Sequence, residues 1–313
     1  MLITEDIYAS RVGSQTSIIE RQDPIIYSQG QPPTSLNQKQ VQFYQDNGFL
    51  FIENFFMPQE VAVFIQEIKR LAALEEITSS EKAIIELGSH TIRSIFWVHR
   101  LSFLFHKLSC DKRILDIVHY LLNDDVYIHQ SRLNFKPAFS GNRFYWHSDF
   151  ETWHIEDGMP RMRTLSAMIM LAENNEFNGP LMLIPGSHKK YVACVGETPT
   201  ENYKQSLKQQ KYGVPDQASL TQLVEENGIV ALKGSAGSIA FFDCNTIHSS
   251  NGNLSPYPRS NVFFVYNSLQ NSLQKPFNGL TLRPEFIATR ENIEPLVSSS
   301  NTDYLTHLRK IHR

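Results

Sequence analysis

Two histidines and one aspartate have the types and spacing of a metal centre. His147 and Asp149 form a His-x-Asp triplet, and His248 follows much later in the chain. Two imidazoles and one carboxylate are the protein ligands that hold non-haem Fe(II) on one face and leave the opposite face open. If His147 and Asp149 lie on a strand, their side chains point the same way and can reach one ion. The residues therefore predict an iron centre.

The surrounding sequence supports this prediction, because a His-x-Asp triplet alone is weak evidence. Aromatic, β-type residues flank the triplet in the stretch 144–154. Downstream, residues 237–243 are typical of a short buried strand, and residues 245–250 of the turn that leaves it. We therefore expect His248 at a strand end. Since the metal would carry the chemistry, we expect no catalytic side chain beyond the metal centre.

A cation and a polar strand face are expected beside the metal. Arg259 opens an apolar run, 261–266, which we expect to form a strand next to the proposed metal site. A permanent cation there suits a dicarboxylate co-substrate. Alternation along the predicted strand 127–139 places one polar set on a single face: Gln130, Arg132, Asn134 and Lys136. We expect this face to line the cavity, with Asn134 contacting the co-substrate.

A longer stretch resembles a known family. Residues 144–163, FYWHSDFETWHIEDGMPRMR, resemble the signature of ectoine hydroxylases, which belong to the phytanoyl-CoA dioxygenase-like group of Fe(II)/2-oxoglutarate enzymes. Residues 179–188, GPLMLIPGSH, resemble the segment that follows a central strand in this group, and the similarity extends from around Asp6 to around Glu294. The resemblance implies hydroxylation of ectoine to 5-hydroxyectoine, a compatible solute, with O2 consumed and succinate and CO2 released.

The resemblance also implies roles for particular residues. Lys136 matches a lysine that these enzymes use for 2-oxoglutarate, and Gln130 and Trp153 match positions that contact ectoine. Ectoine is a cyclic amidinium carboxylate, and aromatic faces attract such a delocalised cation. Trp153, Phe242 and Phe263 could form an aromatic box around it. Simple core packing is an equal alternative for Phe242 and Phe263, because both lie in apolar runs.

Other polar residues near the triplet receive a plainer interpretation. Three acidic residues after it, Glu151, Glu156 and Asp157, are expected in a solvated loop. The remaining nearby histidines are expected at the surface or behind the site, because the ligand set is complete without them: His129, His154 and His188. The cysteines are odd in number and lack metal-binding spacing, so we expect reduced thiols: Cys110, Cys194 and Cys244.

Composition favours an enzyme that acts on small molecules. The chain has 313 residues, 41% of them hydrophobic, which is sufficient for one large core and predicts a single domain, 1–313. A net charge of −3 gives no case for nucleic acid or an anionic membrane. No run approaches the roughly 18 apolar residues of a membrane span, and no signal peptide is apparent. We expect a cytoplasmic monomer or homodimer.

The order of predicted elements indicates an α+β fold that is mainly β. Residues 1–38 are expected to form an extended arm rather than a packed element. Helices and strands are then predicted at these positions: a helix from Ser35 or Asn37 to Gln45, a strand 49–52, a helix 58–74, a strand 91–99, and helices 101–108 and 112–122. A β-rich core, about 126–270, contains a helical insertion at about 201–227. The resemblance implies a double-stranded β-helix, the cupin-like jelly roll, buttressed by helices.

Three alternatives to ectoine hydroxylation remain open. The same scaffold could hydroxylate another small zwitterion, such as a cyclic amino acid. A jelly roll could also bind a ligand without catalysis, although the intact triad and Arg259 argue against this. A zinc hydrolase is less favoured, because no obvious general base lies near the triad and Arg259 would have no role.

Overall fold

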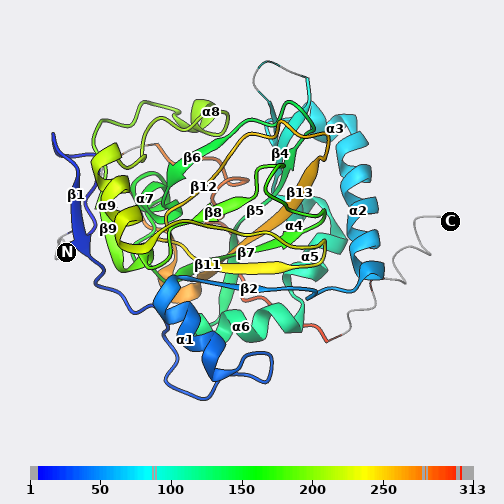
Figure 1. The fold of residues 1–313 in the computed structure, drawn as a ribbon, viewed down its shortest axis with the longest axis horizontal. Coiled ribbons are helices and arrows are strands. Elements are labelled where there is room, and N and C mark those ends of the chain that lie inside the picture. Colours follow the sequence, from blue (N-terminus) through cyan, green and yellow to red (C-terminus); the bar gives the residue numbers. More distant parts are fainter. Residues whose placement is uncertain are drawn as a thin grey trace.

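Two antiparallel sheets form the centre of the protein (Figure 1). The computed structural model describes residues 6–86, 88, 90–276, 279, 281–300 and 304. The large sheet has the strand order β2 (Phe49–Ile52), β11 (Ile239–Asp243), β7 (Thr164–Met170), β13 (Arg259–Ser268), β5 (Val126–Lys136), β4 (Ile92–Phe96) and β3 (Ala83–Ile85). The smaller sheet has the order β10 (Val230–Ala231), β8 (Leu181–Leu183), β12 (His248–Ser250) and β6 (Phe144–His147). A two-stranded sheet pairs β1 (Ser17–Glu20) with β9 (Lys190–Ala193).

Helices surround these sheets, and several begin and end at residues that the sequence marks clearly. The helices before β5 are α1 (Gln38–Asn47), α2 (Pro58–Ala73), α3 (Glu75–Thr78), α4 (Val98–Leu101), α5 (Phe103–Ser109) and α6 (Lys112–Leu122). Asn37 and Gln40 form a capping box that starts α1, and Gly48 ends it in the left-handed conformation. Asp111 caps α6 by accepting a hydrogen bond from the Arg113 amide.

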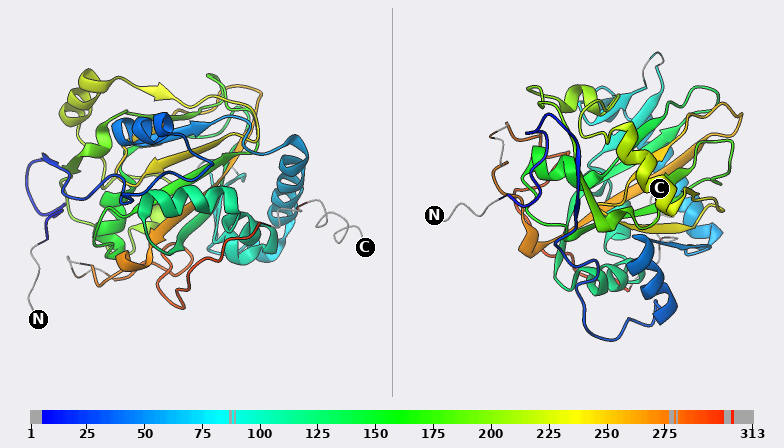
Figure 2. Two further views of the ribbon diagram at one scale, coloured as in Figure 1. Left: turned by 90° about the horizontal axis from the view of Figure 1, so that it is seen from below. Right: turned by 60° about the vertical axis from the view of Figure 1, so that its left-hand side comes forward.

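Apolar clusters cover both faces of the large sheet. On one face, Leu133, Ile169 and Val262 belong to the same buried cluster as residues of α2, α5 and α6. On the other face, Met168 and Phe263 pack with Leu181 and Leu183 of the smaller sheet. Figure 2 shows the teal helix α6 and the yellow-green helix α9 (Gln217–Asn227) on opposite sides of the strands. Two facing antiparallel sheets with helices outside them confirm the predicted α+β, mainly β jelly roll.

Most predicted elements are present, but the two segments around the metal ligands differ from the prediction. The stretch after His147 does not continue as β structure: it forms α7 (Asp149–Thr152) and a π-helical turn, η1 (Trp153–Asp157). The predicted turn at 245–250 ends earlier, because residues from His248 onward form β12. Short 3-10 turns also occur at η2 (Ser187–Lys189) and η3 (Leu269–Asn271). The insertion at 201–227 contains α8 (Tyr203–Ser206) and α9.

The N-terminal arm is packed, which corrects the sequence-based expectation. Its described residues run along the molecule in extended form, and β1 pairs with β9 in antiparallel register. Tyr8, Ser10, Arg11 and Asp23 are all buried. The residue types at the start of the chain indicated only that no helix forms there. Whether the arm is buried depends on segments far away in the sequence, such as β9. In the part of the chain that the structure describes, no helix has the length and apolar character needed to cross a membrane.

Candidate metal centre and substrate pocket

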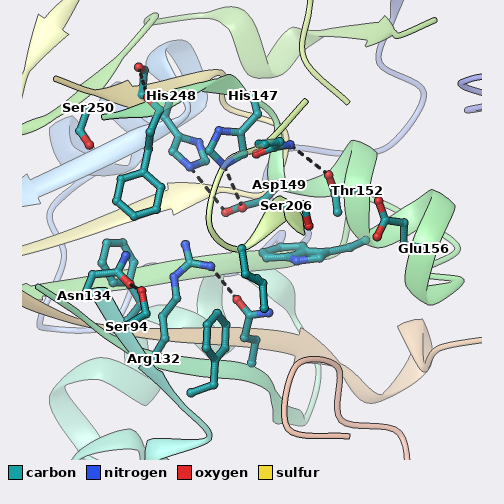
Figure 3. A pocket seen from close by; sticks show the side chains of 18 of the residues that line it. Ser94, Arg132, Asn134, His147, Asp149, Thr152, Glu156, Ser206, His248 and Ser250 are labelled. Carbon is teal, nitrogen blue, oxygen red and sulfur yellow. Dashed lines mark hydrogen bonds and ion pairs between the residues drawn. The ribbon is translucent and has the colours of Figure 1, made fainter. Parts of the chain in front are cut away.

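The three predicted metal ligands meet at one point. His147 ends β6, His248 begins β12, and the two residues are direct partners in the antiparallel register. Asp149 is the first residue of α7, so the two residues do not share a strand, which was the arrangement considered from the sequence. The turn at Ser148 instead brings the Asp149 carboxylate to 3.6 Å from His147 Nε2 and 3.9 Å from His248 Nε2 (Figure 3). One ligand atom from each residue lies within 4.8 Å of the other two.

Hydrogen bonds orient both imidazoles toward this point. His147 Nδ1 donates to the Tyr145 carbonyl oxygen at 2.7 Å, and His248 Nδ1 donates to that of Thr246 at 2.9 Å. Because each Nδ1 carries the proton, each Nε2 presents a lone pair. Among the described residues, Asp149 Oδ2 is buried without a hydrogen-bond partner. These are the atoms that a metal ion requires.

Electrostatics favours the protonation states that bind metal. Burial and the neighbouring His147 lower the pKa of His248 to about 4, so this imidazole is neutral at physiological pH. Burial alone would raise the pKa of the Asp149 carboxyl, but His248, His147 and Arg132 outweigh it and hold that pKa below its usual value. A neutral imidazole and an ionised carboxylate are metal-binding forms. The residues therefore fit an Fe(II) ion.

A pocket between the two sheets lies against the ligands, and most of the predicted binding residues line it. They are Gln130, Asn134, Trp153, Arg259 and Phe263. Arg259 projects from β13, across the pocket from the ligand strands rather than on a neighbouring strand as expected. Its Nε donates to the Gly179 carbonyl oxygen at 2.8 Å. Burial lowers the pKa of Arg259 to about 10, so the side chain remains charged.

Lys136 and Phe242 lie just behind the pocket and are not among the residues that line it. Lys136 Nζ donates to Ser250 Oγ at 2.9 Å and to the Asn251 carbonyl, and Ser250 does line the pocket. Burial, Arg259 and Arg93 lower the pKa of Lys136 to about 6. The Phe242 ring packs edge-on against His248, with 5.2 Å between ring centroids. Phe242 thus supports a metal ligand from within the apolar core.

Two pocket arginines received no role from the sequence. Arg132 is on the polar face of β5, and its Nη1 donates to Gln130 Oε1 at 2.7 Å. Figure 3 shows Arg132 opposite the three metal ligands. Arg283 also lines the pocket and binds Asp157 with two hydrogen bonds of 2.7 and 2.5 Å. Strand alternation correctly placed Arg132 on the face that lines the cavity but assigned it no role, whereas no local pattern marks Arg283.

The acidic run is buried, so the expected solvated loop was wrong. Glu151, Glu156 and Asp157 are each buried and each forms an ion pair with arginine. These arginines come from distant parts of the chain, Arg11 and Arg283, which explains why the local sequence did not reveal the pairing.

The nearby histidines and the cysteines, for which the sequence predicted no role in metal binding, are also buried. Among the described residues, the only cluster with metal-ligand geometry is the predicted triad. The three other histidines that the sequence places near the ligands lie in the interior rather than at the surface: His129, His154 and His188. His129 contacts Trp153, with ring centroids 5.1 Å apart, and therefore lies directly behind the pocket wall. The cysteines are free and buried, as expected: Cys110, Cys194 and Cys244.

Part of the helical insertion forms one wall of the pocket. The lining residues from this segment are Asn202, Ser206, Leu207, Gln210 and Tyr212. Asn202 Nδ2 donates to Glu156 Oε1 at 2.9 Å, which links the wall to η1. The sequence predicted the insertion but did not indicate that it reaches the site.

Comparisons with known proteins agree with this geometry. The family described as phytanoyl-CoA dioxygenase (PhyH) matches residues 44–261. The chain is 54% identical over 287 residues to "Ectoine dioxygenase" of Bordetella bronchiseptica, covering 92% of this chain and 93% of that protein. It is 42% identical over 286 residues to the Halomonas elongata protein of the same name, covering 91% and 86%.

Solved structures of similar proteins agree with the sequence comparisons. The structure of EctD from S. alaskensis with 2-oxoglutarate and 5-hydroxyectoine matches with a TM-score of 0.86 and 42% identity, covering 94% of this chain and 98% of that one. The structure of the same protein with bound Fe matches with a TM-score of 0.84, at the same identity and coverage. The chain therefore belongs to the phytanoyl-CoA dioxygenase family and, within it, to the ectoine dioxygenases.

Proposed function

We propose that the protein hydroxylates ectoine to 5-hydroxyectoine, using Fe(II), 2-oxoglutarate and O2 and releasing succinate and CO2. The observation that carries this proposal is the buried His147–Asp149–His248 cluster facing buried arginines across one pocket. The extensive similarity to proteins named ectoine dioxygenase supports the choice of substrate. No protein side chain is needed as an acid or base.

The triad would hold the iron. His147 and His248 would each supply Nε2, and Asp149 would supply a carboxylate oxygen. Bound iron, together with 2-oxoglutarate and O2, supplies the oxidising power for hydroxylating an unactivated C–H bond. The protein contributes the orientation of the two small molecules and a site from which most water is excluded.

Arg259 and Asn134 would bind 2-oxoglutarate. The buried guanidinium of Arg259 suits the carboxylate farther from the metal, because a fork of N–H groups matches two carboxylate oxygens. Ser94 Oγ donates to Asn134 Oδ1 at 2.8 Å, and this contact leaves the Asn134 amide group to donate to the co-substrate. Lys136 would act through Ser250, to which it is hydrogen-bonded.

Ectoine would occupy the part of the pocket that contains Trp153 and Gln130. The indole of Trp153 offers an aromatic face to the amidinium. Among the described residues, Arg132 Nε is buried without a hydrogen-bond partner, so this guanidinium can still bind a carboxylate. Phe263 stacks beneath Arg132, with 5.0 Å between the guanidinium carbon and the ring centroid, and so fixes the direction of that cation.

A substrate panel tests the proposal. Purified enzyme loaded anaerobically with Fe(II) should form succinate and 5-hydroxyectoine in nearly equal amounts when given ectoine, 2-oxoglutarate and O2. Proline, which lacks the amidinium, should support little turnover, and a reaction without a primary substrate gives the background. If ectoine is unchanged while another zwitterion is hydroxylated, the substrate assignment is wrong and the oxygenase assignment stands. If no compound stimulates succinate formation, the ligand-binding alternative is favoured.

The cytoplasm as the site of action, and a monomer or homodimer as the assembly, stay predictions from the sequence. Gel filtration with light scattering measures the assembly directly.

A further inference from the structure

One arginine of the N-terminal arm is bound to the segment that carries the active site. Arg11 donates from Nε and Nη2 to the two carboxylate oxygens of Glu151, at 3.0 and 2.7 Å. Its Nη1 donates to Glu156 Oε1 at 2.7 Å. All three side chains are buried, with at most 4% of each exposed. A single guanidinium therefore clamps two carboxylates that lie on successive turns of α7 and η1.

The clamped segment carries residues of both the metal site and the pocket. Figure 3 shows Asp149 and Glu156 at the pocket. Trp153, between them in the segment, also lines it. Arg11 itself is not among the pocket-lining residues, so any effect on the reaction must pass through the residues that it binds.

The π-helical turn is bound by two arginines. A π-helix is rare and usually occurs as a single turn, frequently at a functional site. Here η1 has acidic side chains directed to two different arginines: Glu156 binds Arg11, and Asp157 binds Arg283. Arg283 lines the pocket and belongs to the site itself, whereas Arg11 holds the turn from outside.

The same arginine also holds the wall formed by the insertion. Arg11 Nη1 donates to Thr198 Oγ1 at 2.7 Å, and Glu156 Oε1 also accepts from Asn202. The chain returns at Gly213, where an added Cβ would overlap the Glu151 carboxylate. The ion pair is therefore enclosed between η1 and the wall segment 198–213.

The backbone of Arg11 has an unfavourable conformation that its surroundings hold in place. Its φ of 61° is in the left-handed region, which is unfavourable for a residue other than glycine. Its amide donates to the Cys194 carbonyl at 2.8 Å, and the neighbouring Ser10 Oγ donates to Glu151 Oε1 at 2.6 Å. Such strain persists only where the surrounding contacts outweigh it.

We propose that Arg11 is a positioning residue of the active site: through Glu151 and Glu156 it fixes the π-helical turn that directs Trp153 into the pocket, and it joins this turn to the wall 198–213. The inference rests on the proposed function, because its kinetic test uses ectoine. The arm is thus a component of the substrate site, although it contacts neither metal nor substrate.

The test compares Arg11→Lys with a control variant that alters a different ion pair of the arm. Lysine keeps the charge, but its single ammonium nitrogen cannot reproduce the planar fork that binds both oxygens of Glu151 while also reaching Glu156. The control is Arg161→Lys, which alters the ion pair of 2.7 Å between Arg161 and Asp23 of the arm, away from the segment 149–157. We expect Arg11→Lys to raise the KM for ectoine about ten- to a hundredfold, the effect of a small misplacement in an active site. The ratio of 5-hydroxyectoine to succinate should fall, while the KM for 2-oxoglutarate stays near wild type.

A measurement without turnover separates this role from general stability. Hydrogen exchange of the iron-free variant should accelerate in peptides covering 149–158 and 198–213, while peptides from β5 and β13 keep their wild-type rates. Arg161→Lys should change neither the exchange in these peptides nor the coupling ratio. If Arg11→Lys lowers only the melting temperature and leaves KM, coupling and local exchange as in wild type, the positioning role is refuted.

A second variant covers the case in which Arg11→Lys does not fold. Glu151→Gln keeps the volume of the side chain and removes one charge from the cluster. It should show a smaller change of the same kind, and wild-type KM, coupling and exchange in this variant would overturn the proposal. Failure of the proposed function would be seen differently, because the wild-type enzyme would then leave ectoine unchanged. The hydrogen-exchange experiment uses no substrate and would still test whether Arg11 positions the turn.

Discussion

Replacing Arg259 tests the proposed co-substrate site most directly. The side chain is only 6% exposed, and its pKa of about 10 keeps it protonated at neutral pH. Truncating one partner of a buried, hydrogen-bonded charge pair costs about 2–5 kcal/mol. At 1.36 kcal/mol for each tenfold change, Arg259→Ala should raise the KM for 2-oxoglutarate by about 30- to 5000-fold.

The assay measures the KM for 2-oxoglutarate and for ectoine separately, together with the iron content of each variant. Arg259→Lys should recover only part of the loss, because an ammonium cannot reproduce the planar fork of the guanidinium. Arg163→Ala is a matched control: this arginine donates to the carbonyls of Leu122 and Asn123, outside the pocket, and both KM values should stay at wild type. Equal rises in the two KM values of Arg259→Ala would mean general damage, and the assignment of Arg259 would be withdrawn.

Three further results are expected. Alanine at His147, Asp149 or His248 should abolish iron retention and turnover, since each substitution removes one of three ligands. Circular dichroism should show an intact fold, and stoichiometric iron in any variant would exclude that residue from the metal centre. Trp153→Ala should raise the KM for ectoine about 2- to 30-fold, corresponding to about 0.5–2 kcal/mol of cation–π attraction. Iron binding should stay normal, and Trp153→Phe should recover part of the loss. An unchanged KM in both variants would contradict the contact between Trp153 and ectoine. Because Lys136 has a pKa of about 6, and a bound dianion should raise it, Lys136 should take up a proton when 2-oxoglutarate binds, and the affinity for 2-oxoglutarate should fall as pH rises above 6. Calorimetry in two buffers of different ionisation enthalpy measures this uptake, which Lys136→Met should remove; identical heats for wild type in both buffers would refute it.

Local patterns were sufficient for most helices and strands. The capping box at Asn37 and the proline that begins α2 are short-range signals, and the helices start there as predicted. Alternation along β5 correctly placed Gln130 and Asn134 on the pocket side. The same alternation placed Lys136 on this face, but the strand ends there, and the ammonium turns to Ser250 and Asn251 behind the pocket. Side-chain period thus predicted the face of a strand but not the reach of a long side chain.

The sequence by itself determined the ligand set, because the types of His147, Asp149 and His248 specify metal chemistry wherever they meet. Tertiary structure decided how they meet: the strand ends at His147, and the turn at Ser148, not a shared strand face, brings Asp149 to the histidines. Tertiary structure also decided which acidic side chains are buried in ion pairs. Glu151 and Asp157 looked like loop residues because their arginine partners lie far away in sequence. Ion pairs between distant segments leave no periodic signal, so only the folded chain shows which charges are buried and what they hold in place.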